Sequence, residues 1–542
     1  MHAARDGTLY MNVMHILVAD QLPATALAIL SEVPGWTVDA RTGRSPDALA
    51  RDLAHADALV VRSATKVDAT LLEAAPRLRV IARAGTGVDN VDLAAATARG
   101  ILVINAPGAN SVSVAEHALA LMLSLARAVP AADAAMKRGV WDKKSLLGAE
   151  LRGKTLGLVG LGRIGQEVAA RARAFGMEVV AHDPFISDRI AASLGIELLG
   201  LDPLCARADY ISLHVPVTPE TRGLFDLARF RICKPGVRIV NTARGELIDS
   251  SALADAIESG HVGGAGVDVF EIEPPADWRL ARLPQVVATP HIAASTSEAQ
   301  EQVGLETIAG VRDFLLDGIV RNAVNFPAIS SEDMMQLRPY LALADRLGAL
   351  AAHLSEGRTH ALGVRHYGPL VSTHGGLIVG AAVAGMLRPM LSTAVTFVNA
   401  RDVAGQRGIE IIESRSSRPR NFANLLSIKL HTSTGERWLE GTVFEPGRPR
   451  LTLIDGVDVE APLDGTLLIV TNDDQPGVIG EIGSILGRYR INIASFTLGR
   501  GPGGATGVVN LDSGAGEDRL ADALKEIRRV DAVRDARVAA IT

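Results

Sequence analysis

Short apolar runs alternate with longer amphipathic stretches along the first 320 residues of this 542-residue chain. Runs such as residues 16–19 and 59–61 are typical of buried strands, and stretches such as residues 24–32 and 47–54 have the spacing of helices. Regular alternation of strands and helices indicates parallel sheets with helices on both faces. The pattern therefore predicts an α/β fold over this part of the chain.

The same alternation predicts two Rossmann-like lobes, the second inserted into the first. A long helical stretch, residues 111–126, leads into the second lobe, and a final helix, residues 297–316, returns to the first. We expect an outer lobe at residues 14–107 and 305–330 and an inserted lobe at residues 108–304.

The pattern changes after residue 330. Residues 331–460 contain helices and strands without a concentration of chemical motifs, so we expect an α+β domain there. Its apolar run at residues 375–387 is too short to span a bilayer and is expected to be buried core. Residues 465–542 show the order β-α-β-β-α-β, which is typical of a ferredoxin-like domain. The expected strands are residues 466–471, 491–498, 505–511 and 532–541, and the expected helices are residues 476–488 and 517–528.

Composition limits the class of protein. The net charge is -6 and the chain has no basic block, so neither nucleic acid nor a membrane is an expected partner. The two cysteines, Cys205 and Cys233, cannot form a disulfide framework, so they fit a cytoplasmic protein and are expected to be small buried side chains. Residues 1–13 lack the apolar core of a signal sequence and are expected to form a loose tail.

A glycine-rich turn joins a strand to a helix in the inserted lobe. Gly160, Gly162 and Gly165 form a GxGxxG pattern directly after an apolar run. The first glycine permits a tight turn, the second lets the pyrophosphate of a dinucleotide approach the backbone, and the third lets the helix pack on the strand. Asp183 ends the next apolar run, and a carboxylate at that place binds both hydroxyls of an adenosine ribose. The motif predicts a site for NAD rather than NADP.

Three ionisable residues follow consecutive predicted strands of the inserted lobe: Arg244, Glu273 and His291. Sheets of this kind bind ligands at the carboxyl ends of their strands. Oxidation of a 2-hydroxy acid needs a cation for the carboxylate, a base for the hydroxyl proton and a carboxylate that holds the base. Each residue by itself also fits an ordinary surface loop. Their convergence predicts the chemistry of a dehydrogenase.

At these residues the sequence resembles the D-isomer-specific 2-hydroxyacid dehydrogenase family. The resemblance covers the glycine turn and the segments Asn-Thr-Ala-Arg-Gly, Asp-Val-Phe-x-x-Glu-Pro and Thr-Pro-His. It implies that Arg244 binds the substrate carboxylate, that His291 is the acid and base, and that Glu273 is the partner of this histidine. It also implies cofactor contacts at a further set of positions: Thr86, Arg163, Ile164, Val215, Thr242, Ala243 and Asp268.

The outer lobe carries two arginines at strand ends, Arg62 and Arg83. Guanidinium groups match phosphate oxygens, although two surface arginines are an equally simple explanation. Both segments, together with the turn at Asn110, resemble the 3-phosphoglycerate dehydrogenases of this family, which implies that these three residues bind the substrate. A glyoxylate or hydroxypyruvate reductase would need no phosphate clamp and stays an alternative, as does a corepressor-like protein that senses dinucleotides. Glu116 and His117, adjacent on the long helix, are expected to be structural.

The C-terminal segments resemble two regulatory domains. Residues 465–542 resemble the ACT family of amino-acid-sensing domains, which implies an effector site at Asp474 and Asn492 with L-serine as the effector. Residues 331–460 resemble the intervening allosteric domain of long-form members. The resemblance also implies a homo-oligomer, either a dimer or a tetramer. The implied activity is NAD-dependent oxidation of 3-phosphoglycerate to 3-phosphohydroxypyruvate, the first step of serine synthesis.

Overall fold

The computed structural model divides into two compact units, and each is described by itself. It describes residues 13–541 apart from residues 328, 330, 370–372, 392–394, 419–420, 446 and 513–515. The inserted unit comprises Leu22–Ala28 and Ala106–Glu306. The large unit comprises the described residues of Met1–Gln21, Ile29–Asn105 and Thr307–Thr542. Apart from Val13, the expected N-terminal tail lies outside the described residues.

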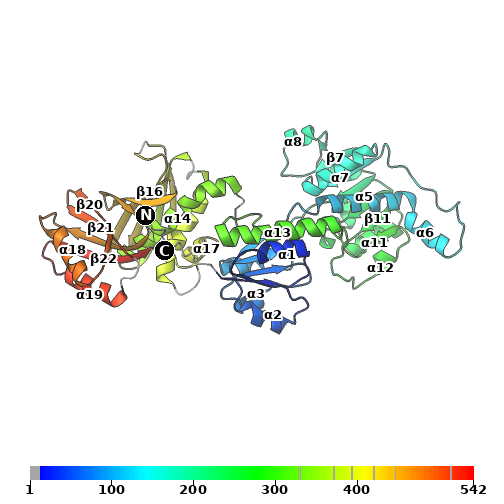
Figure 1. The fold of residues 1–542 in the computed structure, drawn as a ribbon. Coiled ribbons are helices and arrows are strands. Elements are labelled where there is room, and N and C mark those ends of the chain that lie inside the picture. The colour runs from blue at the N-terminus through cyan, green and yellow to red at the C-terminus, as the bar shows by residue number, and fades with distance from the viewer. Residues whose placement is uncertain are drawn as a thin grey trace, which may run out of the picture. The chain divides into compact units, whose positions relative to one another are not determined.

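One parallel sheet of seven strands forms the centre of the inserted unit (Figure 1). Its strands are β6 (Thr155–Val159), β7 (Glu178–His182), β8 (Glu197–Leu198), β9 (Tyr210–Leu213), β10 (Val237–Asn241), β11 (Val262–Val267) and β12 (Val286–Ala288). They lie in the order β12-β11-β10-β9-β6-β7-β8. The central strands β6 and β9 are buried at every residue and β10 at all but one, as parallel strands covered on both faces require.

Helices cover both faces of this sheet. They are α5 (Ser111–Arg127), α6 (Val129–Lys137), α7 (Arg163–Ala174), α8 (Asp188–Ser193), α9 (Leu201–Arg207), α10 (Leu227–Ile232), η1 (Gly245–Leu247), α11 (Ser250–Glu258) and α12 (Arg279–Arg282). One hydrophobic core packs against α5 and α7, and a second packs against α9, α10 and α11. The second core contains Cys205 and Cys233, which are buried free thiols as predicted.

A five-stranded parallel sheet begins the large unit. Its strands are β1 (Met14–Val18), β2 (Trp36–Asp39), β3 (Ala58–Val61), β4 (Val80–Arg83) and β5 (Leu102–Ile104), in the order β2-β1-β3-β4-β5. The helices along this part of the chain are α1 (Ala24–Ser31), α2 (Pro46–Leu53), α3 (Ala69–Glu73), α4 (Leu93–Ala98) and, later in the sequence, α13 (Ser297–Asp317). Helices α2, α3 and α4 begin where the side chains of Ser45, Asp68 and Asp92 accept hydrogen bonds from first-turn backbone N–H groups. The boundary between the two units falls within α1 and within α13.

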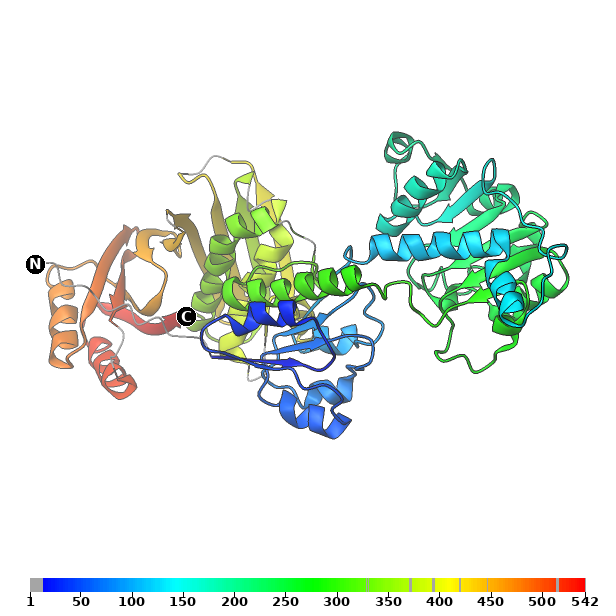
Figure 2. The ribbon, with the colours of Figure 1, turned by 45° about the vertical axis from the view of Figure 1, so that its right-hand side comes forward.

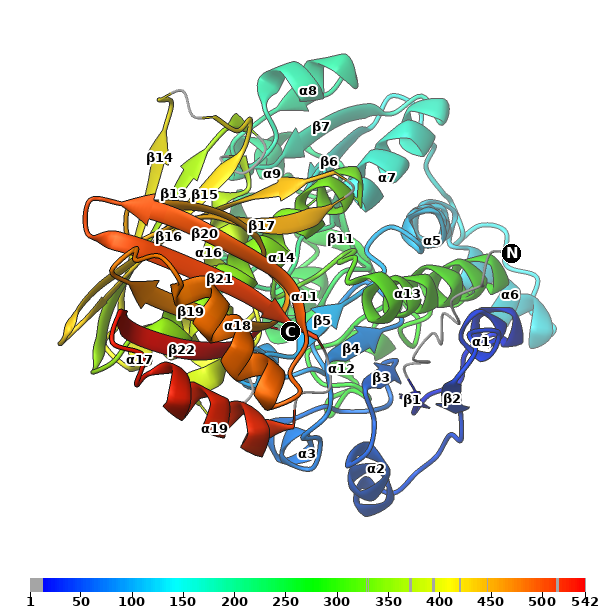
Figure 3. The same ribbon diagram turned by 60° about the vertical axis from the view of Figure 1, so that its left-hand side comes forward.

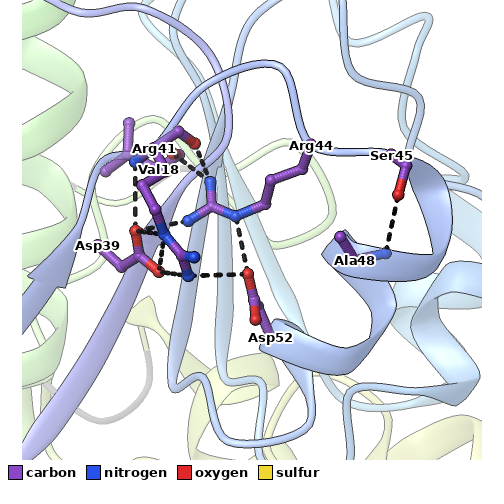
Figure 4. Close-up of polar contacts among 7 residues, drawn as sticks. All are labelled: Val18, Asp39, Arg41, Arg44, Ser45, Ala48 and Asp52. Atoms are coloured by element: carbon purple, nitrogen blue, oxygen red, sulfur yellow. Dashed lines mark hydrogen bonds and ion pairs between the residues drawn. The ribbon is translucent and has the colours of Figure 1, made fainter.

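A charged network ties the ends of β1 and β2 to α2 (Figure 4). The guanidinium of Arg44 pairs with Asp39 at 2.6 Å and donates to the Oδ2 atom of Asp52 at 2.9 Å and to the carbonyl of Val18 at 3.2 Å. Hydrogen bonds from Arg41, and then from Arg44, outweigh burial and hold the pKa of Asp39 well below its ordinary value. The network therefore depends on ionised carboxylates at neutral pH.

A six-stranded mixed sheet follows in the large unit. Its elements are α14 (Ser331–Leu354), β13 (Thr359–Tyr367), α16 (Gly375–Leu387), η2 (Arg388–Met390), α17 (Ala400–Gln406), β14 (Glu410–Ser416), β15 (Leu425–Thr432), β16 (Gly435–Phe444), β17 (Arg448–Ile454) and β18 (Val457–Pro462). The strand order is β14-β13-β15-β16-β17-β18. Figure 2 shows the helices and strands of this part of the chain in green to yellow. Helices α14 and α16 pack on the sheet in one core, and α16 is buried along almost its whole length. The prediction of a buried core at this apolar run is confirmed.

The last part of the large unit is an antiparallel four-stranded sheet. Its elements are β19 (Gly465–Asn472), α18 (Val478–Arg488), β20 (Ile493–Gly501), β21 (Gly504–Leu511), α19 (Glu517–Ile527) and β22 (Val533–Ile541). The strand order is β20-β21-β19-β22, and α18 and α19 share one hydrophobic core with one face of the sheet (Figure 3). The predicted β-α-β-β-α-β order is confirmed, although the second strand begins at Ile493, two residues later than expected.

The segment that precedes α17 contacts the end of α4 within the large unit. The hydroxyl of Thr396 donates to the carbonyl of Gly100 at 2.9 Å, and the side-chain amide of Asn399 donates to the carbonyl of Ala98 at 3.1 Å. These bonds satisfy carbonyls that a helix end leaves without partners. Gly100 has φ +71, and a Cβ there would lie 2.6 Å from the hydroxyl of Thr396, so the contact requires glycine.

The α/β fold class predicted from the sequence is confirmed, with two parallel sheets followed by a mixed and an antiparallel sheet. Within the described residues, no single helix has the length and apolar composition needed to cross a bilayer, and only the bent pair α5–α6 passes that test by length and composition.

Candidate active site

The glycine turn between β6 and α7 has the geometry that a dinucleotide requires. Gly160 has φ +96, and a Cβ there would lie 2.6 Å from the carbonyl oxygen of His214. A Cβ on Gly165 would lie 2.3 Å from the carbonyl oxygen of Gly160, so this glycine permits the close contact between helix and turn. By contrast, a Cβ on Gly162 would have no atom of the described residues within 4 Å. The open position is the one at which a pyrophosphate approaches the backbone.

The start of α7 is suited to an anion. Gly162 is its N-cap residue, and it provides no side chain to bond the first-turn N–H groups. These donors and the helix dipole favour a negatively charged group at this end of a helix. Arg163 and Ile164 form the first turn, and the guanidinium of Arg163 lies beside Gly108. The turn therefore fits the phosphates of NAD.

Asp183 lies directly after β7, beside the glycine turn. Its Oδ2 atom accepts a hydrogen bond from the backbone N–H of Leu161 at 2.8 Å, and its Oδ1 atom accepts one from the N–H of Phe185 at 2.9 Å. These bonds hold the carboxylate at the strand end where a ribose binds in such sheets. Binding of the ribose by Asp183 stays a prediction.

The residues predicted for catalysis follow three neighbouring strands. Strand β11 lies between β10 and β12, with Asn241 paired to Val267 and Val267 paired to Ala288. Arg244 follows the end of β10, Glu273 lies on the loop after β11, and His291 lies on the loop after β12. Because the strands are parallel, all three loops begin at the same edge of the sheet.

His291 and Glu273 are in direct contact. The Nδ1 atom of His291 lies 2.6 Å from the Oε2 atom of Glu273, and the Oε1 atom of the same carboxylate accepts from the N–H of Phe270 at 3.1 Å. An ionised carboxylate can only accept, so this contact places the proton of a neutral imidazole on Nδ1 and leaves Nε2 as the free acceptor. Half of the His291 side chain is exposed. The pair can therefore take a proton from a bound molecule.

The backbone of His291 is left-handed, with φ +53. For a residue other than glycine this conformation costs about 1 kcal/mol, so neighbouring groups must hold it. The N–H of His291 donates to the carbonyl of Asp268 at 2.8 Å. The carboxylate of Asp268 is completely buried and accepts hydrogen bonds from the N–H groups of Ile292 and Ala293 at 2.8 and 2.9 Å. Asp268 thus holds the loop of His291 through both its backbone carbonyl and its side-chain carboxylate.

A side-chain amide organises the loop that carries Arg244. Asn241 is buried, donates to the carbonyl of Arg244 at 2.8 Å and accepts from the N–H of Ala243 at 3.0 Å. Gly245 follows, and a Cβ there would lie 2.0 Å from the carbonyl carbon of Phe270, so the loop after β11 crosses directly over it. Glycine at this position lets the loops of Arg244 and Glu273 lie against each other.

Three other predicted cofactor contacts, Val215, Thr242 and Ala243, follow the carboxyl ends of strands in this sheet, and a fourth, Thr86, does not. A Cβ on Gly160 would lie 2.8 Å from the side chain of Val215, so this valine borders the glycine turn. Thr242 is buried next to Ala243 on the loop after β10. Thr86 belongs to the large unit, where its carbonyl accepts from the side-chain amide of Asn105. Contact of these residues with a cofactor stays a prediction.

The two predicted substrate arginines end adjacent strands of the large unit. Val61, the residue before Arg62, pairs with Arg83 across β3 and β4. The carboxylate of Asp20 accepts from the N–H of Arg62, and a Cβ on Gly85 would overlap the guanidinium of Arg83. The fold therefore places these two arginines at the carboxyl ends of adjacent strands. Asn110, the third predicted substrate residue, is the N-cap residue of α5 in the inserted unit.

The two predicted effector residues bind different partners in the ACT-like sheet. The carboxylate of Asp474 pairs with the guanidinium of Arg500 at 3.1 Å, and Asp474 itself has φ +54. The side-chain amide of Asn492 donates to the carboxylate of Asp512. Both contacts are exposed. An effector role for Asp474 and Asn492 stays a prediction.

The sequence did not predict several residues that shape these edges. Asp20 binds the N–H of Arg62 and both the N–H and the hydroxyl of Thr65. Asn90 donates to the carbonyl of Arg62 at 2.6 Å. Their signal in the sequence is weak, because an acidic residue after a strand and an Asn in a turn are common. Their role depends on contacts between segments that are distant in the chain.

Family models match three consecutive parts of the chain. Residues 119–293 match the D-isomer specific 2-hydroxyacid dehydrogenase, NAD binding domain. Residues 336–455 match the D-3-phosphoglycerate dehydrogenase intervening domain, and residues 466–532 match the ACT domain.

Curated proteins are similar along nearly the whole chain. A D-3-phosphoglycerate dehydrogenase from Archaeoglobus fulgidus is 41% identical over 527 residues, which are 96% of this chain and 99% of that protein. A protein of the same name from Mycobacterium tuberculosis is 44% identical over 515 residues, 94% of this chain and 96% of that protein. A crystal structure of a glyoxylate reductase from Paecilomyes thermophila matches with a TM-score of 0.54 and 32% identity, covering 58% of this chain and 99% of that one. The likeness to the reductase thus leaves two fifths of the chain unmatched.

Proposed function

The chain belongs to the D-3-phosphoglycerate dehydrogenase family, and from this we propose that it oxidises 3-phosphoglycerate to 3-phosphohydroxypyruvate with NAD, the first step of serine synthesis. The observation that carries the proposal is the contact of 2.6 Å between His291 and Glu273 at the strand ends of an NAD-binding domain. A cytoplasmic location stays a prediction from the two free cysteines.

In this proposal the arginines bind different groups of the substrate. Arg62 and Arg83 bind the phosphate end, because guanidinium forks match phosphate oxygens, and Asn110 adds a polar contact. Arg244 binds the carboxylate next to the reacting carbon. Its cation also polarises the oxygen on that carbon, and therefore stabilises the charge that develops there.

His291 is the base. Its Nε2 atom takes the proton of the C2 hydroxyl while Glu273 holds Nδ1 and stabilises the imidazolium that forms. NAD, when bound, would supply the hydride acceptor for C2. Its phosphates would lie at the glycine turn, and its ribose beside Asp183. In the reverse direction His291 returns the proton as an acid.

We also propose regulation by L-serine at Asp474 and Asn492 of the ACT domain. A carboxylate suits the ammonium group of an amino acid, and an amide can bind its carboxylate. The two residues lie at the loop before α18 and directly before β20.

A homo-oligomer, dimer or tetramer, is part of the proposal. Large apolar side chains are exposed on α6 and on the loop that follows it: Val129, Met136, Val140, Trp141 and Leu147. Trp141 is 81% exposed and Leu147 is 94% exposed. Contiguous exposed apolar residues mark interaction sites. Light scattering of the full chain should give twice or four times the mass of 57.0 kDa, and Trp141→Glu should reduce it.

The test is NADH oxidation with 3-phosphohydroxypyruvate, with and without L-serine. We expect turnover without serine and slower turnover with it. Turnover that serine leaves unchanged would refute the regulatory part alone. Undetectable turnover with every 2-ketoacid, in a protein that still binds NADH, would refute the enzymatic part and favour a corepressor-like sensor.

The likeness to a glyoxylate reductase supports a second candidate, reduction of glyoxylate or hydroxypyruvate. These substrates carry no phosphate, so they would make no use of Arg62 and Arg83. Faster turnover of unphosphorylated ketoacids than of 3-phosphohydroxypyruvate would favour this candidate.

A further inference from the structure

A partly buried hydrogen-bonded chain links α5 to the loop of His291. His117, on α5, places its Nε2 atom 3.0 Å from the hydroxyl oxygen of Thr289 and 3.4 Å from the Oδ1 atom of Asp268. The hydroxyl of Thr289 donates to the same Oδ1 atom at 2.6 Å. A hydroxyl that donates to a carboxylate accepts from the imidazole, so the Nε2 atom of His117 carries the proton. The chain therefore runs from His117 through Thr289 to Asp268.

Asp268 transmits this contact to the base. Its carboxylate has no exposed surface, and it also accepts the N–H groups of Ile292 and Ala293, which directly follow His291. Burial alone would raise the pKa of Asp268, but the hydrogen bonds from His117, Thr289 and the two amides lower it below its ordinary value. The carboxylate is therefore ionised at neutral pH and holds the loop on which His291 lies.

The position of α5 relative to this carboxylate is tightly determined. Strand β11 ends directly before Asp268, and a Cβ on its Gly266 would lie 2.8 Å from the Cβ of Leu121 on α5. Leu121 is one helical turn after His117. The glycine lets the helix backbone approach the strand closely, so His117 and Asp268 belong to one packed contact rather than to two movable surfaces.

We propose that His117 is a positioning residue for His291, acting through Thr289 and Asp268. This inference rests on the proposed function of His291 as the base. His117 is not itself the base, because its Nε2 proton is committed to Thr289 and Asp268 and only 18% of its side chain is exposed. Its role is to keep the left-handed loop in the conformation that pairs His291 with Glu273.

The neighbouring Glu116 provides a matched control. Its side chain is 62% exposed and contacts Arg171 at 3.4 Å, away from Asp268. Glu116→Gln changes the same turn of α5 without touching the chain of hydrogen bonds. It should leave turnover within twofold of the unmodified protein.

The experiment compares His117→Ala, His117→Gln and Thr289→Val in NADH oxidation with 3-phosphohydroxypyruvate, with NADH binding followed by fluorescence. His117→Ala should lower kcat about 10- to 100-fold, since a small displacement of a catalytic group has effects of this size. KM and the Kd for NADH should stay within twofold. His117→Gln keeps an amide donor at the position of Nε2 and should recover most of kcat, whereas Thr289→Val should reproduce the loss.

A double variant separates positioning from general stability. In a His291→Asn background, His117→Ala should cause no further loss of kcat, because the residue it positions is gone. An additional loss of the same size as in the single variant would refute the inference, and so would wild-type kcat in His117→Ala. If His117→Ala does not fold, the test uses His117→Gln and Thr289→Val instead. Equal losses of kcat in these two variants would refute the inference. Wild-type turnover of His291→Asn alone would refute the proposed function instead.

Discussion

The loop that carries the proposed base His291 and the turn that carries the predicted effector residue Asp474 hold their polar groups in different ways. His291 lies on a loop bound by the completely buried carboxylate of Asp268. Asp474 is bound by an ion pair to Arg500, whose side chain is 73% exposed. Buried charged hydrogen bonds are costly to break, whereas exposed ion pairs contribute about 0–1 kcal/mol. The loop of His291 is therefore firmly held, whereas Asp474 can exchange its ion-pair partner at small cost.

Removal of the base should have the largest effect. His291→Asn leaves no group to accept the hydroxyl proton at this place, so kcat should fall about 10³- to 10⁴-fold, near the upper end of what general base catalysis contributes. Steady-state NADH oxidation measures this loss, and NADH binding serves as the control for folding. A loss below tenfold would contradict the assignment.

Removal of the charge beside the base should have a smaller effect. Glu273→Gln keeps an oxygen for the N–H of Phe270 but cannot stabilise the imidazolium at the Nδ1 atom of His291. We expect a loss in kcat of about 10²-fold, at the lower end of the same range. The same assay checks it, and unchanged turnover would show that Glu273 only shapes the loop.

The buried carboxylate of Asp268 should link stability to pH. Its folded-state pKa is lowered, so its contribution to stability is present above the unfolded-state pKa of about 3.9 and is lost as the pH falls through the folded-state value. Asp268→Asn should cost about 1–3 kcal/mol at pH 7, because the amide cannot accept from all of the donors. Thermal unfolding of both proteins between pH 7 and pH 3 measures the difference. The difference should shrink toward pH 3, and a constant one would contradict the role of the charge.

The exposed ion pair should give the smallest effect. Arg500→Ala frees the carboxylate of Asp474 for an ammonium group, so inhibition by L-serine should strengthen, by no more than about fivefold. Arg534→Ala is the matched control, because it removes a similar exposed ion pair with the neighbouring Asp473. Equal inhibition curves for Arg500→Ala and the unmodified protein would show that Arg500 does not compete with the effector.

The candidate active-site residues could be named from the sequence because their signals are local. Gly160 and Gly165 belong to one turn, and Arg244 and His291 each follow a strand that its own apolar run reveals. The contacts that support these residues could not be predicted. His117 and Thr289 are 172 residues apart, and their contact depends on how α5 packs on β11. The histidine was therefore expected to be merely structural, since no local pattern distinguishes it.

The contacts of the predicted effector residues could not be predicted from the sequence either. The order of elements in the ACT domain followed from hydrophobic periodicity, and Asp474 and Asn492 were named from the resemblance to the ACT family. Their partners are 26 and 20 residues away: Arg500 lies on β20 and Asp512 directly follows β21, so strand register decides which side chains meet. A short apolar run predicts a strand but does not specify its register.

The most direct test of the proposed function compares kcat/KM for 3-phosphohydroxypyruvate with kcat/KM for hydroxypyruvate, in the unmodified protein and in Arg62→Ala. We predict a strong preference for the phosphorylated ketoacid that falls at least tenfold in the variant, while turnover of hydroxypyruvate changes less than twofold. A preference for hydroxypyruvate in the unmodified protein, or an equal loss for both substrates in Arg62→Ala, would contradict the proposed function.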